Sequence, residues 1–325
     1  MRLLVTGGAG YIGSVCAANL MEAGHEVVVL DDLSTGHAAA VPDGLELERV
    51  DLLDREGLGR AVGRGFDGAL HFAARALVEE STRLPELYWR INVGGTRNLL
   101  DALREGGVGR LVFSSTCAVY GYPTEVPITE EAALDPVTPY GSSKQAVDRM
   151  IHDESAAHGL GAASLRYFNV AGASGGLGED HRPETHLIPL VLDAAAGDRD
   201  AISIYGTDYP TSDGTAIRDY IHVDDLADAH RLALEALEPS RHSIFNLGNG
   251  AGYSVREVVE RAREVTGAEI PAVDADRCPG DPPALVASNG RIRDELGWEP
   301  RKPELATMIA DAWAWRQAHP RGYGD

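Results

Sequence analysis

A tyrosine and a lysine stand four positions apart in the stretch Tyr140-Gly-Ser-Ser-Lys144. On a helix this spacing puts both side chains on one face about one turn apart, so both can reach the same cleft. A phenol has a pKa of roughly 10 and is a poor base at neutral pH unless nearby positive charge lowers that pKa. Lys144 is one of only two lysines, with Lys302. The alternative is an exposed helix that carries the pair by chance, so the rest of the chain must decide whether the pair is an acid/base centre.

A glycine-rich turn near the N-terminus has the spacing of a phosphate-binding loop. It lies between a short apolar strand at 3–5 and a helix that we expect to run to about residue 23. Backbone N–H groups at such a helix start bind a pyrophosphate, and glycines let it approach closely. The residues predicted to contact a dinucleotide here are Gly7, Gly10, Tyr11, Ile12 and Gly13.

Two acidic residues follow the next predicted strand, 26–30. Asp31 stands 18 residues after Gly13 and is followed by Asp32. An acidic side chain at this place hydrogen-bonds a ribose diol and repels a 2′-phosphate. The sequence therefore predicts NAD, rather than NADP, as the cofactor.

Strands and helices alternate through the first half of the chain. This pattern is typical of a parallel, Rossmann-type doubly wound sheet, and it predicts an α/β fold. The expected strands are 45–51, 68–74, 110–116 and 163–170, and the expected helices are 54–62, 86–105 and 141–158. Ligands bind at the carboxyl ends of such strands. The residues expected at that edge are Asp51, Ala73, Ala74, Ser114, Ser115, Thr116 and Asn169.

The composition changes after Val170 to Gly, Pro and polar residues. We therefore expect an NAD-binding domain at 1–172 and a smaller mixed α/β substrate domain at 173–325, with a segment near 215–250 returning to the first. Expected strands are 202–205, 243–247 and 285–287, and expected helices begin near 187 or span 224–236, 254–265 and 303–317. Asp224 or Asp225 is predicted to cap the helix that starts there.

The bulk composition excludes several classes of partner. Acidic residues outnumber basic ones, 50 against 29, and the net charge of −21 argues against nucleic acid or an acidic membrane. No apolar run approaches the roughly 18 residues of a membrane span, and the N-terminus enters a strand at once, so we expect a cytoplasmic protein without a signal peptide. Three widely spaced cysteines, Cys16, Cys117 and Cys278, argue against a disulfide framework or a zinc site, and we expect no metal.

These features meet in one expected cleft. The nicotinamide end of the cofactor would extend along the strand ends toward Ser114, Thr116 and the helix of Tyr140. A Tyr140 phenolate, favoured by Lys144 and the oxidised ring, takes a hydroxyl proton while carbon gives hydride to the nicotinamide. Thr116 is placed to orient the substrate oxygen or relay its proton; the alternative is a strand-end threonine satisfied by backbone. The residues alone predict an NAD-dependent alcohol/carbonyl redox step.

Several longer segments carry a resemblance to a known family. They read TGGAGYIGS at the glycine turn, HFAA at 71–74, FSST at 113–116, YGSSK at 140–144, LRYFNVAGA at 165–173, TDYPTSDGTAIRDYIHVDDLAD at 207–228, FNLGNG at 245–250 and WRQAHPRGYGD at 315–325. In these the chain resembles, over its whole length, the UDP-glucose 4-epimerases (UDP-galactose 4-epimerases) of the extended short-chain dehydrogenase/reductase superfamily.

The resemblance implies a tightly held NAD, oxidation of a UDP-sugar at C4, rotation of the 4-keto sugar within the site, and reduction on its opposite face. It also implies a homodimer through the helices at 86–105 and 141–158, and a place in galactose metabolism. By position Tyr140 is the base, Thr116 its hydroxyl partner and Lys144 the ribose partner. Further implied cofactor contacts are Asp51, Leu52, Phe72, Ala73, Ala74, Asn92, Ser114, Tyr140 and Phe168. Implied substrate contacts are Thr116, Tyr140, Asn169, His186, Leu187, Ser203, Tyr205, Arg218, Arg277 and Asp281.

Three positions depart from the family pattern. Cys278 replaces an arginine of an RRxGD segment that spans 277–281 here, which puts the affinity for the diphosphate in doubt. Ala76 stands where many relatives have a lysine near the cofactor. Leu285 occupies a position whose size gates 2-acetamido sugars, so activity on UDP-GlcNAc or UDP-GalNAc stays open.

Other functions compete with this prediction. A nucleotide-sugar dehydratase needs an Asp-Glu pair after Thr116, where this chain has Cys117 and Ala118. An epimerase for a pentose or uronate nucleotide remains open. A non-catalytic NAD-binding regulator is compatible with the fold, but it has no need of Tyr140, Lys144 and Thr116 together.

Overall fold

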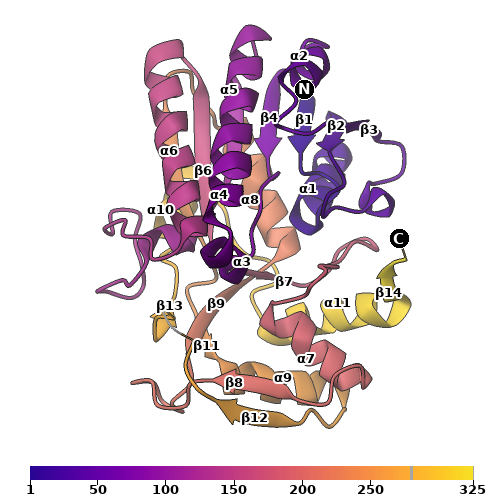
Figure 1. Ribbon diagram of the computed structural model, residues 1–325, viewed down its shortest axis with the longest axis vertical. Helices are drawn as coiled ribbons and strands as arrows, with labels where there is room; N and C mark the ends of the chain where they lie inside the picture. Colours follow the sequence, from indigo (N-terminus) through magenta and orange to yellow (C-terminus); the bar gives the residue numbers. More distant parts are fainter. Residues whose placement is uncertain (279–280, 325) are drawn as a thin grey trace.

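The computed structural model describes residues 1–278 and 281–324 and is built on a seven-stranded parallel sheet. Its order is β10-β6-β5-β4-β1-β2-β3, which confirms the Rossmann-type fold (Figure 1). The strands are β1 Arg2–Thr6, β2 Glu26–Asp31, β3 Glu46–Arg49, β4 Gly68–His71, β5 Arg110–Thr116, β6 Gly161–Tyr167 and β10 His242–Leu247. Pro279 and Gly280, in the predicted diphosphate segment, and Asp325 lie outside the described residues.

Both faces of this sheet are covered by helices, because its central strands are apolar on both sides. In β1, Leu3 and Val5 belong to one buried cluster and Leu4 to the other. The first cluster lies under α1 (Tyr11–Glu22) and α8 (Val223–Glu235), and the second under α2 (Arg55–Val62), α5 (Thr96–Glu105) and α6 (Pro139–His158). Figure 1 shows α5 and α6 side by side over the second face. The edge strand β3 is only partly buried.

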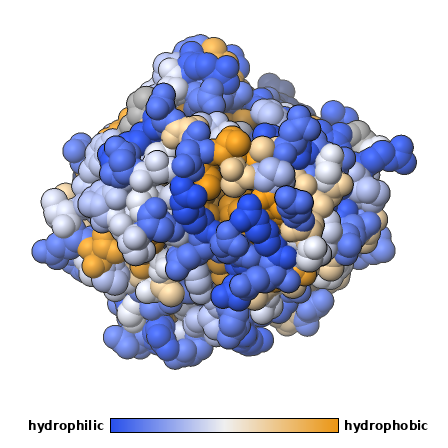
Figure 2. Space-filling model, turned by 90° about the horizontal axis from the view of Figure 1, so that it is seen from below, coloured by the Kyte–Doolittle hydropathy of each residue, from blue (hydrophilic) through white to orange (hydrophobic). Residues whose placement is uncertain are grey.

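A second, smaller unit lies beyond the carboxyl ends of these strands (Figure 1). Strands β7 (Asn169–Ala171), β9 (Ile217–His222), β11 (Gly252–Ser254) and β13 (Ala284–Leu285) form a four-stranded sheet, and β8 (Ile202–Tyr205) pairs with β12 (Ala272–Ala275). Helices α7 (Leu187–Ala196), α9 (Val255–Thr266) and α11 (Leu305–Ala318) share one apolar core. The end of the molecule seen in Figure 2 is largely hydrophilic, with a small apolar area near its centre.

The chain passes between the two units more than once. β6 joins the large sheet, whereas β7, two residues later, pairs with β9 in the small one, so the single strand predicted at 163–170 is two strands. α8 and β10 return to the large sheet, and α10 (Gly290–Leu296) packs near β10. The last strand is β14 (Pro320–Tyr323), and short 3₁₀ turns lie at Ala38–Ala40 and Cys117–Tyr120. Among the described residues there is no helix with the length and apolarity that crossing a membrane requires.

The helix predicted at 86–105 is wrong as one continuous element. The segment is divided into α4 (Pro85–Tyr88), a π-helical turn over Trp89–Gly95, and α5, and a separate short helix, α3 (Val78–Arg83), precedes it. The turn contains the buried Asn92, whose side chain bonds the backbone of Arg75 instead of facing solvent. π-Helical turns of this kind occur where a helix accommodates a specific side-chain requirement. The spacing of apolar residues does not indicate a hydrogen bond of this kind between a side chain and the backbone.

The predicted helix caps at Asp224 and Asp225 are also wrong. The residue that caps α8 is His222, whose Nδ1 accepts a hydrogen bond from the Asp224 N–H at 3.0 Å. The Asp225 carboxylate accepts from the N–H groups of Arg301 and Lys302 at 2.8 and 2.9 Å. The Asp224 carboxylate pairs with Lys302 Nζ at 2.9 Å, so both acids hold the chain after α10 against α8.

Candidate active site

The glycine turn between β1 and α1 has the geometry of an anion cradle. Gly7 has a φ of +72°, and a Cβ there would lie 2.4 Å from the Ala73 nitrogen. A Cβ at Gly13 would lie 2.2 Å from the Gly7 oxygen, whereas at Gly10 the nearest atom is 3.4 Å away. Gly7 and Gly13 are thus required by backbone packing, and Gly10 leaves an open approach to the helix start. Gly10 also provides no side-chain cap, so the first N–H groups of α1 are available to a pyrophosphate.

Asp31 lies at the carboxyl end of β2 beside this turn. Its two oxygens accept from the Ala9 N–H at 3.0 Å and the Leu33 N–H at 2.9 Å. Burial raises the pKa of Asp31, and these two hydrogen bonds oppose that rise. The carboxylate is therefore fixed in orientation at the edge where a ribose diol is expected, while Asp32 accepts from the Ser34 N–H.

The other predicted cofactor residues lie along the same edge. Leu52 is buried in the sheet core, while Asp51 is exposed. Phe72 lies 4.8 Å from the His230 ring, and Ala73 and Ala74 continue from β4. The amide of Asn92 also donates to the Ser143 hydroxyl at 3.0 Å, so its side chain is occupied in joining the π-helical turn to α6.

The predicted acid/base pair lies at the start of α6. Thr138 caps this helix by accepting from the Gly141 N–H, and Pro139 occupies its first position. Tyr140 is partly buried, with its ring edge-on to Tyr88 at 6.4 Å, and Lys144 is only 2 % exposed. The Lys144 Nζ donates to the Ser114 carbonyl at 2.7 Å and lies 4.7 Å from the centre of the Phe113 ring. Helix α6 and strand β5 together fix the pair.

In the protein without its cofactor, Lys144 does not lower the pKa of Tyr140. Burial raises the pKa of Tyr140 to about 12; a hydrogen bond with Thr116 opposes the rise, and Cys117 adds to it. Burial also lowers the pKa of Lys144 to about 7, opposed by Asp148. Burial thus disfavours the charged form of both groups, so the expected phenolate depends on the charge of the oxidised ring as well as on Lys144.

Hydroxyl groups surround this pair on β5 and β6. Thr116 is 7 % exposed and accepts from the Ala118 N–H at 3.2 Å, besides its hydrogen bond with Tyr140. The Ser114 hydroxyl bonds the Tyr167 hydroxyl. Phe168 follows Tyr167 and is buried with Tyr120. The hydroxyl groups on β5 and β6 are thus held in fixed positions.

The structure contains a buried ion pair behind Lys144 that the sequence analysis did not predict. Asp148 lies one further turn along α6, and its Oδ2 accepts from the Arg166 Nε and Nη2 at 3.1 and 3.0 Å. Arg166 Nη1 also donates to the Tyr120 hydroxyl, and Ser115 donates to Asp148. The signal was available in the repeated spacing of four from Tyr140 to Lys144 to Asp148.

A cavity of about 320 Å³ opens in the second unit. Seven predicted substrate residues line it, namely Asn169, His186, Leu187, Ser203, Tyr205, Arg218 and Asp281. The cavity is also lined by Arg199 and Tyr220, which the sequence analysis did not identify, and by Cys278. Residues from β7, β8, β9 and the start of α7 thus converge on one site.

Arg218 is the best-placed cation in this cavity. One guanidinium nitrogen pairs with Asp281, and another donates to the Ile217 carbonyl at 2.7 Å. Its side chain is 14 % exposed. The charge of Arg218 also acts on Cys117, directly after Thr116, by opposing the burial that raises the pKa of that thiol to about 12. Arg218 therefore connects the cavity electrostatically with the Tyr140 cleft.

Arg277 is placed differently and does not line this cavity. Its Nε donates to Asp208 at 2.6 Å, and its guanidinium lies 4.2 Å from the centre of the Tyr209 ring. The side chain of Ala76 is exposed. Leu285 is partly buried, packs against the cluster of Tyr120 and Phe168, and pairs in register with Arg218.

The geometry supports two linked sites. The large sheet presents a dinucleotide cradle and a buried Tyr-Thr-Lys group, and the smaller unit presents a cavity with a fixed arginine. Such an arrangement can bind a dinucleotide along one edge and hold an anionic substrate against the phenol.

Comparison with known proteins places these features in context. The model of the NAD dependent epimerase/dehydratase family matches residues 3–248. A UDP-glucose 4-epimerase of Streptomyces lividans is 58 % identical over 327 aligned residues, which cover 100 % of this chain and 98 % of that protein. A crystal structure of a UDP-glucose 4-epimerase superposes with a TM-score of 0.96 at 46 % identity, covering 99 % of both chains. The UDP-glucose 4-epimerase from Brucella ovis in complex with NAD gives 0.92 at 44 % identity, covering 96 % of this chain and 97 % of that one.

Proposed function

The chain belongs to the NAD dependent epimerase/dehydratase family, and from that premise we propose how its residues act in the interconversion of UDP-glucose and UDP-galactose at C4. It is an NAD-dependent UDP-sugar 4-epimerase. The observation that carries the assignment of the site is the buried group of Tyr140, Thr116 and Lys144 next to the glycine cradle.

The residues present fit the cofactor. The cradle at Gly7, Gly10 and Gly13 suits its pyrophosphate, Asp31 suits the adenine ribose, and Lys144 suits the nicotinamide ribose. When bound, NAD supplies the acceptor for the hydrogen of C4 and, in its oxidised form, a positive charge close to the phenol. That charge is needed because the pKa of Tyr140 is about 12 in the protein alone.

Tyr140 then acts as the base and Thr116 as its hydroxyl partner. The phenolate accepts the proton of the sugar 4-hydroxyl as this carbon is oxidised, and the same phenol returns the proton when the 4-keto sugar is reduced on its other face. The hydrogen bond between Thr116 and Tyr140 supports this assignment because it favours the phenolate. Lys144, held by the Ser114 carbonyl, positions the ribose and adds charge in the fraction of molecules where it is protonated.

The cavity around Arg218 holds the nucleotide diphosphate in this proposal. An acidic protein needs a fixed cation at that point, and the planar guanidinium suits phosphate oxygens. Asp281 pairs with Arg218 and orients it. The diphosphate therefore either replaces Asp281 as the partner of Arg218 or binds Arg218 together with Asp281. Asn169, His186, Leu187, Ser203 and Tyr205 line the remainder and contact uracil, ribose or sugar. The 4-keto sugar has to rotate while this diphosphate stays fixed.

The proposal includes a cytoplasmic homodimer built on the helical segments at 86–105 and 141–158. Trp89 is 44 % exposed on the first of them, and the neighbouring Leu84 is also 44 % exposed. Pairing of two copies would remove this apolar surface from water. A monomeric mass in light scattering at micromolar protein concentration would reject the dimer.

A substrate panel tests the proposed function. Purified protein is incubated, without added reductant, with UDP-glucose, UDP-galactose, UDP-GlcNAc, UDP-GalNAc and UDP-xylose, and each product is identified. We expect interconversion of the first two. Turnover of the 2-acetamido pair would show that Leu285 permits these larger sugars, and full NAD occupancy without any turnover would favour a regulatory protein.

A further inference from the structure

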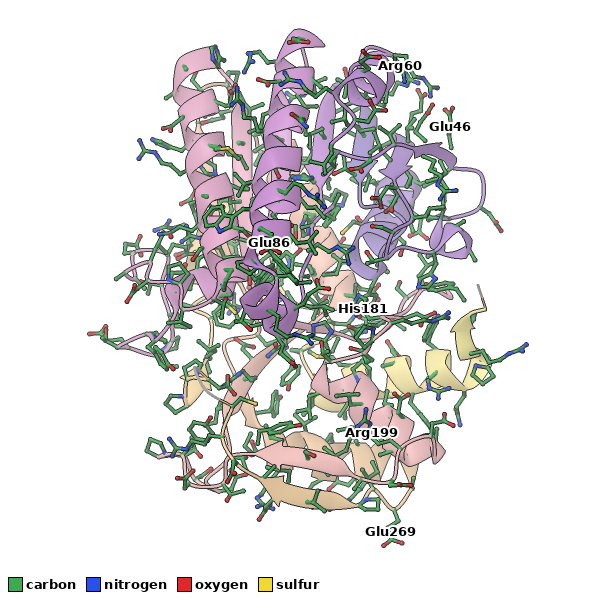
Figure 3. All side chains as sticks on the ribbon, viewed as in Figure 1. Glu46, Arg60, Glu86, His181, Arg199 and Glu269 are labelled. Carbon is green, nitrogen blue, oxygen red and sulfur yellow. The ribbon has the colours of Figure 1, made fainter. Side chains whose placement is uncertain are left out.

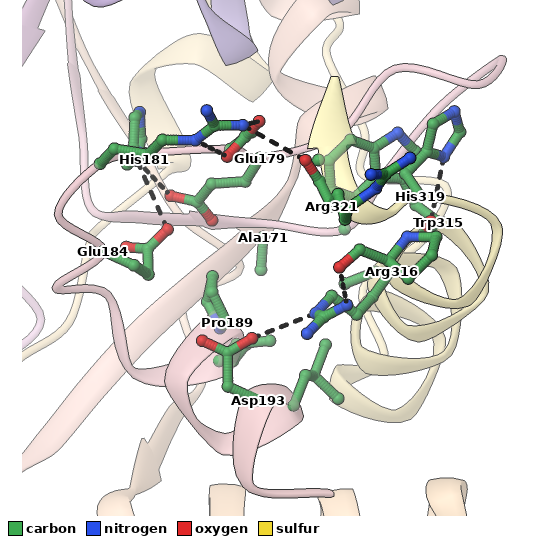
Figure 4. Close-up of a pocket in the computed structure, with 18 of the residues that line it drawn as sticks. Ala171, Glu179, His181, Glu184, Pro189, Asp193, Trp315, Arg316, His319 and Arg321 are labelled. Atoms are coloured by element: carbon green, nitrogen blue, oxygen red, sulfur yellow. Dashed lines mark hydrogen bonds and ion pairs between the residues drawn. The ribbon is translucent and has the colours of Figure 1, made fainter. Parts of the chain in front are cut away.

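We propose that Glu179, His181, Glu184 and His186 form a structural binding site for a divalent transition-metal ion of the Zn²⁺ type. All four belong to the segment between β7 and α7, and one ligand atom from each lies within 4.8 Å of the others. Figure 4 shows His181 joined by dashed lines to the carboxylates of Glu179 and Glu184 at the edge of a cavity, and Figure 3 places His181 near the junction of the two units. The cluster contains none of the three cysteines.

The separations of these atoms are close to those of a metal site. With Zn–N and Zn–O bonds of about 2.0–2.2 Å, two ligands of a tetrahedral ion lie about 3.4 Å apart. Nδ1 of His186 lies 2.6 Å from Glu179 Oε1. Nδ1 of His181 lies 3.1 Å from Glu179 Oε1 and 3.7 Å from Glu184 Oε2. All four ligand atoms lie within 4.8 Å of one another, so small side-chain movements would bring them to these separations.

One ligand atom has no satisfactory partner within the described residues. His181 Nδ1 is buried and, despite its short distance to Glu179, makes no hydrogen bond of acceptable geometry. Two imidazole nitrogens thus converge on one carboxylate oxygen, and only His186 bonds it well. An ordinary ion-pair cluster would leave this nitrogen unsatisfied, whereas a metal ion would bind it together with the other three atoms.

The carboxylate of Glu184 is already oriented for such a role. Its Oε1 accepts from the N–H groups of Thr185 and His186 at 2.6 and 2.7 Å. These bonds leave Oε2 directed at His181. Fixing a ligand through bonds to its other atoms is the usual function of the outer shell around a metal.

The donor set selects the class of ion. Two imidazoles and two carboxylates suit Zn²⁺ and its neighbours Co²⁺ and Ni²⁺, while Mg²⁺ and Ca²⁺ prefer oxygen ligands alone. Four protein ligands fill a tetrahedral ion and leave no position for a substrate. The site is therefore structural rather than catalytic.

The position of the cluster gives the ion a role in ordering the site. Glu179, His181 and Glu184 line a cavity of about 470 Å³ beside α11, while Thr185, His186 and Leu187 line the cavity that contains Arg218. The segment between β7 and α7 has no helix or strand of its own. An ion bound across 179–186 would fix the residues that lead into the second cavity.

Metal titration of the full chain tests this inference without reference to activity. The protein is treated with a chelator, dialysed and titrated with ZnCl₂ by calorimetry, alongside His181→Ala, Glu179→Gln and the control His158→Ala, an exposed histidine at the end of α6. We expect one Zn²⁺ per chain in the wild type and the control, and at least a tenfold weaker affinity in the other two variants. Co²⁺ should give the visible absorption of a four-coordinate ion.

Thermal unfolding supplies a second measurement on the same proteins. Zn²⁺ should raise the Tm of the wild type and of His158→Ala, because an ion that binds only the folded state stabilises it. The rise should be absent in Glu179→Gln, which keeps the size of the side chain, even if His181→Ala folds poorly. Absence of Zn²⁺ binding by the wild type, or equal affinity in all folded variants, would overturn the proposed site.

Discussion

The Tyr140–Lys144 pair and the Arg218–Asp281 pair are built in different ways. The first comes from one turn of one helix and lies against a strand of the large sheet. The second joins residues that are 63 positions apart, on β9 and on the segment before β13. The first pair has its geometry fixed by local structure, and the second has it fixed only when the smaller unit folds. In the proposed function, the chemistry is thus placed on the large sheet and substrate recognition on parts assembled from remote segments.

The two pairs also differ in the charge that their side chains carry. Lys144 and Tyr140 are both buried, and their pKa values move toward the neutral forms. Arg218 retains partial exposure and a carboxylate partner. Under the proposed function, the Tyr140–Lys144 site therefore depends on charge brought by its ligands, whereas Arg218 is held by its Asp281 partner before the substrate arrives.

Tyr140→Phe is expected to give the largest effect. Loss of the acid/base group should lower kcat by at least about a hundredfold, the low end for such groups. The NAD content should stay unchanged, because the phenol is not part of the glycine cradle. The matched control is Tyr122→Phe, which alters a tyrosine that is 53 % exposed. Retained activity in Tyr140→Phe would exclude this residue as the acid/base group. The proposed difference between the Tyr140–Lys144 pair and the Arg218–Asp281 pair would then be wrong.

Arg218→Ala and Arg277→Ala test the recognition side. Arg218 lines the cavity, so its loss should raise KM for UDP-galactose about tenfold to a hundredfold, the range for one or two charge-assisted hydrogen bonds of about 1.5–3 kcal/mol. Arg277 is bound to Asp208 outside the cavity lining, and we expect less than about a threefold change from its loss. Steady-state kinetics measure both, and equal effects of the two substitutions would contradict the assignment of Arg218.

Because Lys144 is buried, we expect the free energy of unfolding to change gradually with pH. Its pKa is lowered from the usual 10.5 to about 7 in the folded protein, so between these values the unfolded chain binds more protons than the folded one. The free energy of unfolding therefore gains a contribution that rises with pH from about 7 to 10.5 and is flat below about 7. Lys144→Met removes this contribution.

Denaturant unfolding of cofactor-free wild type and Lys144→Met at several pH values measures the difference. The stability of the wild type relative to the variant should increase from pH 7 toward 10. A difference that stays constant over this range would show that Lys144 keeps its ordinary pKa and remains charged in the cleft.

Local patterns predicted the large parallel sheet and the elements that carry the candidate site. The glycine turn, Asp31, Thr116 and the Tyr140 helix each follow from spacing and from the alternation of strands with helices. The break at Asn92 and the His222 cap were not predicted, because they depend on hydrogen bonds to Arg75 and Asp224 rather than on periodicity.

The rest depends on contacts between distant segments. β9 was not predicted, although it supplies Arg218, because its polar residues pair with partners far along the chain. Asp219 in this strand accepts from the N–H groups of Asn249, Gly250 and Ala287. The orientation of Arg277 likewise depends on Asp208. No spacing rule within one element contains this information.

The central claim is a reversible oxidation at C4 in which the same hydrogen leaves and returns. UDP-galactose carrying deuterium at C4 is converted in ordinary water, and the UDP-glucose formed is examined by mass spectrometry and NMR. The account predicts that the product retains deuterium at C4. Replacement of that deuterium by solvent hydrogen would contradict the account, since it would show that C4 loses a proton to water instead.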